Sequence, residues 1–226
     1  MNVITAENLA KCIDHTLIRP NVTRKEVENL CGEAKYYSFR AVCVNLSYLP
    51  LAYDLLKNTH IRIGATIGFP FGATSTSIKI AEVKEAIGLG ANELDAVINI
   101  GYLRSGDLDY VRREVVTLVE TAKSLGKIAV KAIIETGYLN EEEKVSACMI
   151  AKEAKVDFIK TSTGIGTTGA TVEDVMLIRK VVGKSVGVKA SGGIDSYEKA
   201  VRMLNAGADI IGTSHGVAIM NEAMKR

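Results

Sequence analysis

Eight short apolar segments alternate with helical segments along the whole chain. The apolar segments are rich in Val and Ile and lie at residues 14–18, 41–45, 62–67, 93–98, 129–134, 157–160, 187–190 and 209–212. Most are apolar on both faces, which is typical of parallel strands buried between two layers. Regular alternation predicts right-handed crossovers and a parallel sheet. The sequence therefore predicts an α/β fold, and eight uninterrupted units favour a closed (β/α)₈ TIM barrel over an open doubly wound sheet.

Helices are predicted between these strands. One covers Val27, Leu30, Cys31 and Ala34, which follow the i, i+3, i+4 spacing of a buried helix face. Others are predicted at residues 49–57, 76–89, 108–125, 141–154, 172–182, 197–206 and 214–225, and a short N-terminal helix at 5–12.

Capping patterns support these boundaries. Two Thr residues precede an acidic residue at capping-box spacing, and three glycines lie where a left-handed residue would end a helix. These residues are Thr23 with Glu26, Thr171 with Asp174, and Gly90, Gly126 and Gly207. No linker or low-complexity stretch divides the chain, so a single domain spanning residues 1–226 is predicted.

Composition excludes several classes of function. The chain has 226 residues, 47% of them hydrophobic, which suits one sizeable core. Its 28 basic and 26 acidic residues are mixed, and without a basic run we expect no nucleic-acid partner. The four cysteines have no CxxC pairing and the three histidines lie far apart, so we expect free thiols and no metal site.

The location expected from the sequence is cytoplasmic. Residues 1–7 lack the charged segment followed by an apolar segment that marks a signal peptide. No apolar run approaches the ~20 residues needed to span a bilayer, so no membrane association is expected.

Two lysines and one carboxylate end apolar strand-like runs. Lys160 ends residues 157–160, Lys189 ends 186–189, and Asp95 ends 93–95. In barrels of this kind the active site lies at the carboxyl ends of the strands. Burial lowers the pKa of a lysine and a second cation acts in the same direction, which leaves a free amine able to attack a carbonyl. The arrangement predicts Schiff-base chemistry.

Each of these residues also has a structural interpretation. A lone lysine after a strand is usually a solvated surface residue, but two at adjacent strand ends, each followed by small residues, favour function. Asp95 is either an ion-pair partner of a lysine or a proton shuttle. Asp14 either caps the chain entering the first strand or orients Lys189 in a supporting role. We expect His15 to be a hydrogen-bonded structural residue, and Cys43 to be a small apolar residue in the barrel rather than a nucleophile.

Glycine-containing turns predict a phosphate site. Gly192 and Gly193 follow the seventh strand, and residues 212–214 follow the eighth strand and open the last helix. Exposed backbone N–H groups and a helix amino terminus bind phosphate, commonly in the loops after strands seven and eight of a barrel. Gly164, Gly166 and Thr167, after the sixth strand, extend the predicted cradle.

Two other functions would also explain a phosphate-binding cradle. An isomerase or epimerase would act through an enediolate without an imine, which leaves the paired lysines unexplained. A non-catalytic barrel would only bind a phosphorylated ligand, and would bury Asp95 and Lys160 without purpose.

Along essentially its whole length the chain resembles the 2-deoxy-D-ribose-5-phosphate aldolase family. The matching segments occur in the family's order: Asp14-His15-Thr16-Leu17, Ala41-Val42-Cys43-Val44, Gly68-Phe69-Pro70-Phe71-Gly72, residues 93–101, Lys131-Ala132-Ile133-Ile134-Glu135-Thr136, residues 158–164 and residues 188–194.

The resemblance implies a class I aldolase that needs no metal or cofactor. Such an enzyme cleaves 2-deoxy-D-ribose 5-phosphate to D-glyceraldehyde 3-phosphate and acetaldehyde, in the breakdown of deoxyribose phosphate. It implies that Lys160 forms the Schiff base, Lys189 keeps that amine neutral, Asp95 moves protons through water, and Asp14 positions Lys189. Substrate and phosphate contacts are expected at Cys43, Thr163, Gly164, Gly192, Gly193, Gly212 and Ser214. A homo-oligomer is also expected.

The sequence departs from the family pattern at two places. Some members have a lysine after the Thr-Gly of the sixth strand, where this chain has Ile165. The chain also ends at Met224-Lys225-Arg226, without the terminal tyrosine that some longer members use near the site. Phosphate contact and the last proton transfer are the steps these departures affect.

Overall fold

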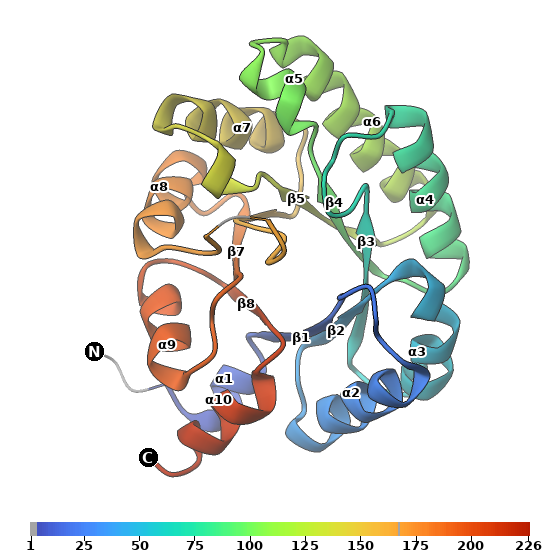
Figure 1. Cartoon of the computed structure of the whole chain (residues 1–226), viewed down its shortest axis with the longest axis vertical. Coiled ribbons are helices and arrows are strands. Elements are labelled where there is room, and N and C mark those ends of the chain that lie inside the picture. The colour runs from blue at the N-terminus through green and yellow to red at the C-terminus, as the bar shows by residue number, and fades with distance from the viewer. Residues whose placement is uncertain (1–3, 167) are drawn as a thin grey trace.

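The computed structural model describes residues 4–166 and 168–226, so Thr167 of the predicted cradle lies outside the described residues. The described chain forms a closed barrel of eight parallel strands in sequence order, surrounded by a ring of helices (Figure 1). Each strand pairs with the next, and Asp14 of the first strand pairs with Gly212 of the last. The predicted TIM barrel is confirmed.

The strands agree with their predicted ranges within one residue at each end. They are β1 (Ile13–Leu17), β2 (Ala41–Val44), β3 (Arg62–Ile67), β4 (Glu93–Val97), β5 (Ala129–Ile133), β6 (Phe158–Lys160), β7 (Gly187–Ser191) and β8 (Ile210–Thr213). Nearly all their residues are buried, because side chains on one face fill the barrel and those on the other contact the helices.

The predicted helices are also present. They are α1 (Ala6–Ala10), α2 (Arg24–Tyr37), α3 (Leu49–Leu56), α4 (Thr76–Gly88), α6 (Leu108–Leu125), α7 (Glu141–Glu153), α8 (Val172–Val182), α9 (Tyr197–Asn205) and α10 (Gly216–Ala223). Val27, Leu30, Cys31 and Ala34 form the buried face of α2, as their spacing predicts.

Most capping predictions are confirmed. Thr23 and Glu26 form a reciprocal capping box at α2, and Thr171 accepts a hydrogen bond from the backbone N–H of Asp174 at α8. Gly90 and Gly207 follow α4 and α9 with φ of 99° and 112°. Gly126 was predicted to end α6 in the left-handed helical conformation, and this is wrong, because its φ of 156° and ψ of −168° are nearly extended.

Three short helices were not predicted. They are α5 (Ile100–Arg104) and two 3₁₀ turns, η1 (Leu46–Tyr48) and η2 (Thr136–Tyr138). Asn99, two residues after β4, caps α5 by accepting a hydrogen bond from the backbone N–H of Tyr102. Each of these turns follows a strand at the mouth of the barrel, where five residues or fewer show no helical periodicity.

None of the helices in the described residues is long and apolar enough to cross a membrane. The four cysteines are free thiols.

Candidate active site

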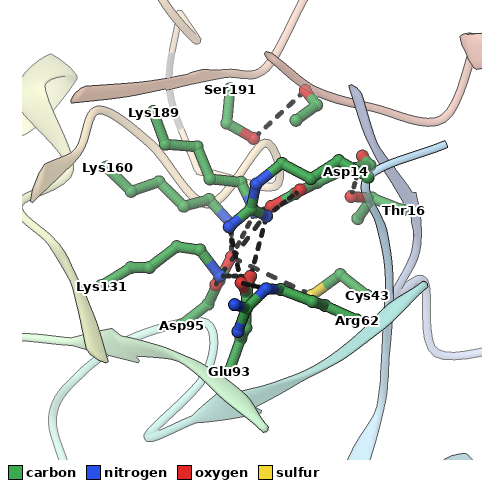
Figure 2. Close-up of polar contacts among 12 residues, drawn as sticks. Asp14, Thr16, Cys43, Arg62, Glu93, Asp95, Lys131, Lys160, Lys189 and Ser191 are labelled. Atoms are coloured by element: carbon green, nitrogen blue, oxygen red, sulfur yellow. Dashed lines mark hydrogen bonds and ion pairs between the residues drawn. The ribbon is translucent and has the colours of Figure 1, made fainter. Parts of the chain in front are cut away.

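Three lysines from consecutive strands converge on one carboxylate inside the barrel. Figure 2 shows the side chains of Lys131 on β5, Lys160 on β6 and Lys189 on β7 pointing toward Asp95 on β4. The Nζ atom of Lys131 lies 2.9 Å from Asp95 Oδ1, and those of Lys160 and Lys189 each lie 2.8 Å from Asp95 Oδ2. All four side chains are buried.

Two further carboxylates, those of Asp14 and Glu93, also contact the lysines of this cluster. Asp14 Oδ2 accepts a hydrogen bond from Lys189 Nζ at 2.7 Å, and Glu93 Oε2 accepts one from Lys131 Nζ at 2.6 Å. Arg40 joins the two carboxylates by donating to Asp14 at 2.6 Å and to Glu93 at 2.5 Å. The ion pairs therefore continue from Arg40 to Lys160 without interruption.

The cluster is balanced in charge when one amine is neutral. Within the described residues its buried or largely buried members are four basic side chains and three acidic ones: Arg40, Lys131, Lys160 and Lys189 with Asp14, Glu93 and Asp95. Arg62 adds a fifth cation 3.4 Å from Glu93 Oε1, but its side chain is 49% exposed and solvent screens its charge. An unbalanced buried charge is costly in free energy. The cluster therefore favours one uncharged lysine.

The pKa shifts show which groups stay ionised. Burial raises the pKa of a carboxyl, but Lys189, Lys131 and Arg40 outweigh it and lower the pKa of Asp14 to about 2. The three lysines lower the pKa of Asp95 in the same way, well below its usual range. Burial lowers the pKa of a lysine, but Asp14 and Asp95 outweigh it and raise the pKa of Lys189, and carboxylates also raise that of Lys131. These four groups are charged at neutral pH.

Lys160 differs from the other two lysines in the number of carboxylates that it contacts. Lys189 is paired with Asp14 and Asp95, and Lys131 with Glu93 and Asp95. Among residues 4–166 and 168–226, Lys160 is paired with Asp95 alone. Lys160 therefore has fewer carboxylates next to its amine than either of the other two lysines.

Cys43 and His15 occupy the positions expected from the sequence. The Cys43 sulfur is buried, 4.0 Å from Asp95 Oδ2, and burial together with the Asp95 charge raises the pKa of its thiol to about 11. A thiol that stays protonated is a poor nucleophile. His15 Nε2 lies 2.7 Å from Glu33 Oε2, which makes His15 a hydrogen-bonded structural residue.

A cavity of about 320 Å³ opens above this cluster at the carboxyl ends of β1, β6, β7 and β8. Seven residues of the predicted cradle line it: Thr163, Gly164, Gly192, Gly193, Gly212, Thr213 and Ser214. Cys43 lies in the barrel interior and is not part of the cavity wall. Of the predicted substrate and phosphate contacts that lie within the described residues, all but Cys43 and Gly166 therefore line the 320 Å³ cavity.

Glycine is required at two positions around the cavity. Gly192 has φ of 93°, and a Cβ there would lie 2.8 Å from the Cα of Gly169. Gly212 was predicted to follow the eighth strand, and this is wrong, because β8 continues to Thr213. A Cβ at Gly212 would lie 2.8 Å from the Cε of Lys189, so this glycine makes room for the lysine side chain.

Two other placements differ from the sequence analysis. Lys189 was expected at the end of its strand, but β7 continues to Ser191, which places the lysine inside the barrel. Ser214 was expected to open the last helix, which instead begins at Gly216. In both cases backbone pairing or local chain geometry, which the sequence pattern does not show, moved the boundary by one or two residues.

Sequence reasoning missed the roles of Lys131, Glu93 and Arg40 in the cluster. Lys131 lies in the middle of an apolar strand, whereas the sequence prediction rests on lysines at strand ends. A charged residue inside an otherwise apolar parallel strand must find a partner, and this signal could have identified Lys131 and Glu93. Arg40 directly precedes β2 and has no comparable signal.

Comparison with known proteins gives a consistent result. The family model described as DeoC/LacD family aldolase matches residues 8–222. A protein of Caldanaerobacter subterraneus subsp. tengcongensis named deoxyribose-phosphate aldolase is 52% identical over 97% of this chain and 95% of its own. One of Thermococcus gammatolerans with the same name is 53% identical over 96% of both chains.

Solved structures agree. The tetrameric deoxyribose phosphate aldolase of Aeropyrum pernix superimposes with a TM-score of 0.90 at 35% identity, over 96% of this chain and 91% of that one. The structure of QR15, described as an aldolase, superimposes with a TM-score of 0.91 at 40% identity over 96% of both chains.

Proposed function

Because this chain belongs to the DeoC/LacD family of aldolases, we propose that it is a deoxyribose-phosphate aldolase. It cleaves 2-deoxy-D-ribose 5-phosphate reversibly to D-glyceraldehyde 3-phosphate and acetaldehyde. The observation that carries this function is the convergence of Lys160 and Lys189 on Asp95 below a cavity at the barrel mouth.

In this proposal the phosphate end of the substrate binds in the 320 Å³ cavity. Gly192, Gly193 and Gly164 have positive φ there, and their lack of side chains leaves backbone N–H groups open to a ligand. Binding the far end of the substrate orients its carbonyl carbon toward the lysines, so the binding free energy of the phosphate contributes to the rate.

Lys160 is the nucleophile in this proposal. Its neutral amine attacks the C1 aldehyde of the open-chain sugar, and loss of water gives an iminium ion. Lys189 is held charged by Asp14 and Asp95, so a positive charge next to Lys160 disfavours protonation of the attacking amine.

The iminium ion then accepts the electrons of the C2–C3 bond. As this bond breaks, Asp95 removes the proton of the C3 hydroxyl through a water molecule, and carbons C3 to C5 leave as D-glyceraldehyde 3-phosphate. The enamine that remains on Lys160 is protonated at C2 and hydrolysed to acetaldehyde. Proton transfer by a positioned group contributes roughly 10²–10⁴-fold to the rate.

Borohydride trapping with 2-deoxy-D-ribose 5-phosphate tests this function. Mass mapping is expected to find a reduced two-carbon or sugar-phosphate adduct on Lys160. An adduct on Lys189 instead would keep the aldolase and reverse the two lysine roles. If the folded protein forms no adduct with confirmed substrate, imine chemistry is wrong and an enediolate isomerase becomes the better interpretation.

Assembly and location extend the proposal. We expect a homo-oligomer, supported by the tetramer of the A. pernix relative and by the exposed aromatic side chains of Tyr36 and Phe71. Light scattering after size-exclusion chromatography measures the assembly state. A cytoplasmic location suits the four free thiols, since a reducing compartment keeps them reduced.

A further inference from the structure

Glu135 has an unusual backbone conformation at the barrel mouth. It lies two residues after the end of β5, its side chain is buried, and its φ of 49° and ψ of 67° place it in the left-handed region. A residue with a Cβ rarely adopts this conformation. Such strain persists where the surrounding structure enforces it, and it is concentrated at functional sites.

The contacts of Glu135 are with the loop after β6. Its Oε2 atom accepts a hydrogen bond from the backbone N–H of Thr163 at 2.9 Å. The hydroxyl of Thr163 in turn accepts hydrogen bonds from the backbone N–H groups of Ile165 at 3.1 Å and Gly166 at 3.2 Å. One buried carboxylate thus fixes the residue that organises the whole turn.

Packing supports the same conclusion. A Cβ at Gly166 would lie 3.1 Å from the Cδ of Glu135, so the loop lies directly against the carboxylate. The backbone N–H of Thr136 also donates to the carbonyl oxygen of Thr161 at 2.9 Å, which ties the two loops together next to Glu135.

This loop is the wall between two cavities. Thr163, Gly164 and Ile165 line the 320 Å³ cavity in which the phosphate is placed. Ile165 also lines a second cavity of about 310 Å³, together with Glu135 and Gly166. Glu135 therefore stands behind the phosphate cavity wall, outside direct reach of the substrate in that cavity.

We propose that Glu135 is a positioning residue that holds the Thr163–Gly166 turn in the shape that binds the substrate's phosphate. It acts through the backbone of Thr163 and does not contact substrate. The inference rests on the proposed function, because it assumes that the 320 Å³ cavity receives the phosphate group.

Two substitutions separate this role from a merely structural one. Glu135→Gly removes the acceptor of the Thr163 N–H and at the same time relieves the backbone strain, since glycine adopts positive φ readily. Glu135→Gln keeps an acceptor oxygen at nearly the same position. Steady-state kinetics are measured with 2-deoxy-D-ribose 5-phosphate and with 2-deoxy-D-ribose, and inorganic phosphate is tested as an inhibitor of the second reaction.

We expect Glu135→Gly to raise KM for the phosphorylated sugar by about tenfold. This is the size of effect expected when a hydrogen bond to a charged group is lost. Inhibition by inorganic phosphate weakens by a similar factor. The kcat/KM for 2-deoxy-D-ribose changes by less than about twofold, because only phosphate binding is lost. Glu135→Gln is expected to restore the KM of the wild type.

Asp157→Ala is the matched control. Asp157 also accepts a backbone hydrogen bond, from Val130 at 2.7 Å, but it lies just before β6 at the opposite end of the barrel. Asp157→Ala is expected to leave the ratio of kcat/KM for the two sugars unchanged. The proposal is overturned if Glu135→Gly changes kcat/KM equally for both sugars, or if it leaves KM for the phosphorylated sugar unchanged. It is also overturned if Glu135→Gln raises that KM as much as Glu135→Gly does. Lack of turnover by the wild type with either sugar would instead contradict the proposed function.

Discussion

Lys160 and Lys189 are register partners on adjacent strands, and their Nζ atoms lie at the same distance, 2.8 Å, from one oxygen of Asp95. They differ in their other contacts, because Lys189 has a second carboxylate, Asp14, at 2.7 Å. Two lysines at the same distance from Asp95 thus have different numbers of carboxylate neighbours. The proposed mechanism uses this difference: Lys189 is the charged neighbour, and Lys160 is the amine that attacks the substrate.

Replacing Lys160 with arginine is expected to abolish turnover while leaving the fold intact. A guanidinium can still donate a hydrogen bond to Asp95 but cannot form an imine. We expect kcat to fall by roughly 10³-fold or more, as for loss of a covalent nucleophile. Kinetics and circular dichroism measure the two effects.

Lys184→Arg, at an exposed position, is the control for the Lys160 variant and is expected to behave as the wild type. Turnover by Lys160→Arg at a rate close to that of the wild type would show that Lys160 does not form the Schiff base.

Replacing Lys189 with methionine is expected to slow the enzyme and to move its pH–rate profile. The variant loses the cation that disfavours protonation of Lys160, so the acidic limb of the profile moves to higher pH. It also leaves Asp14 and Asp95 with one fewer buried partner, which destabilises the fold by about 3–5 kcal/mol. A profile that is lower in amplitude but unmoved along the pH axis would remove Lys189 from this role.

Asp14 is expected to contribute to stability in a defined pH window. Its pKa is lowered to about 2 in the folded protein, so its contribution is complete above the ordinary pKa of 3.8 and is lost as the pH falls through about 2. The difference in unfolding free energy between the wild type and Asp14→Asn should therefore shrink between about pH 4 and pH 2. Urea unfolding at several pH values measures it, and a constant difference would contradict the expected ion pairing of Asp14.

Ile165 offers a gain of phosphate affinity. Its side chain is 47% exposed at the edge of the 320 Å³ cavity in which we propose that the phosphate binds. Ile165→Lys places an ammonium group there, and we expect KM for 2-deoxy-D-ribose 5-phosphate to fall by up to about tenfold. KM for 2-deoxy-D-ribose should not change. Ile165→Met provides a control of similar size, and an equal effect of Met and Lys would show that charge is not responsible.

Much of the fold follows from local pattern. The strand and helix order, the closed parallel barrel and the buried face of α2 are all evident from apolar spacing, because each element must bury one face or both. The short turns η1, η2 and α5 are not evident, since they contain five residues or fewer and are fixed by contacts at the barrel mouth.

The candidate site was predictable in part. Lys160, Lys189, Asp95 and Asp14 are polar residues at or near strand ends, where barrels place their sites, and the structure brings all four together. The glycines of the phosphate cavity carry a similar signal. Lys131 carries a weaker signal, because a charge inside an apolar strand indicates a buried partner without showing which one. Arg40 carries none, because it precedes β2 and only the folded barrel brings it to Asp14 and Glu93.

The amino-acid pattern alone establishes a barrel and the presence of lysines and acids on its strands, because periodicity and burial act within a few residues of each other. Which charges meet is decided by strand register and barrel closure. Asp95 is the partner of Lys131 in the β4–β5 pair, and Lys189 reaches Asp14 across 175 positions of sequence because β8 pairs with β1. Register and closure depend on the packing of all eight strands at once, and for that reason the electrostatic difference between Lys160 and Lys189 exists only in the folded barrel.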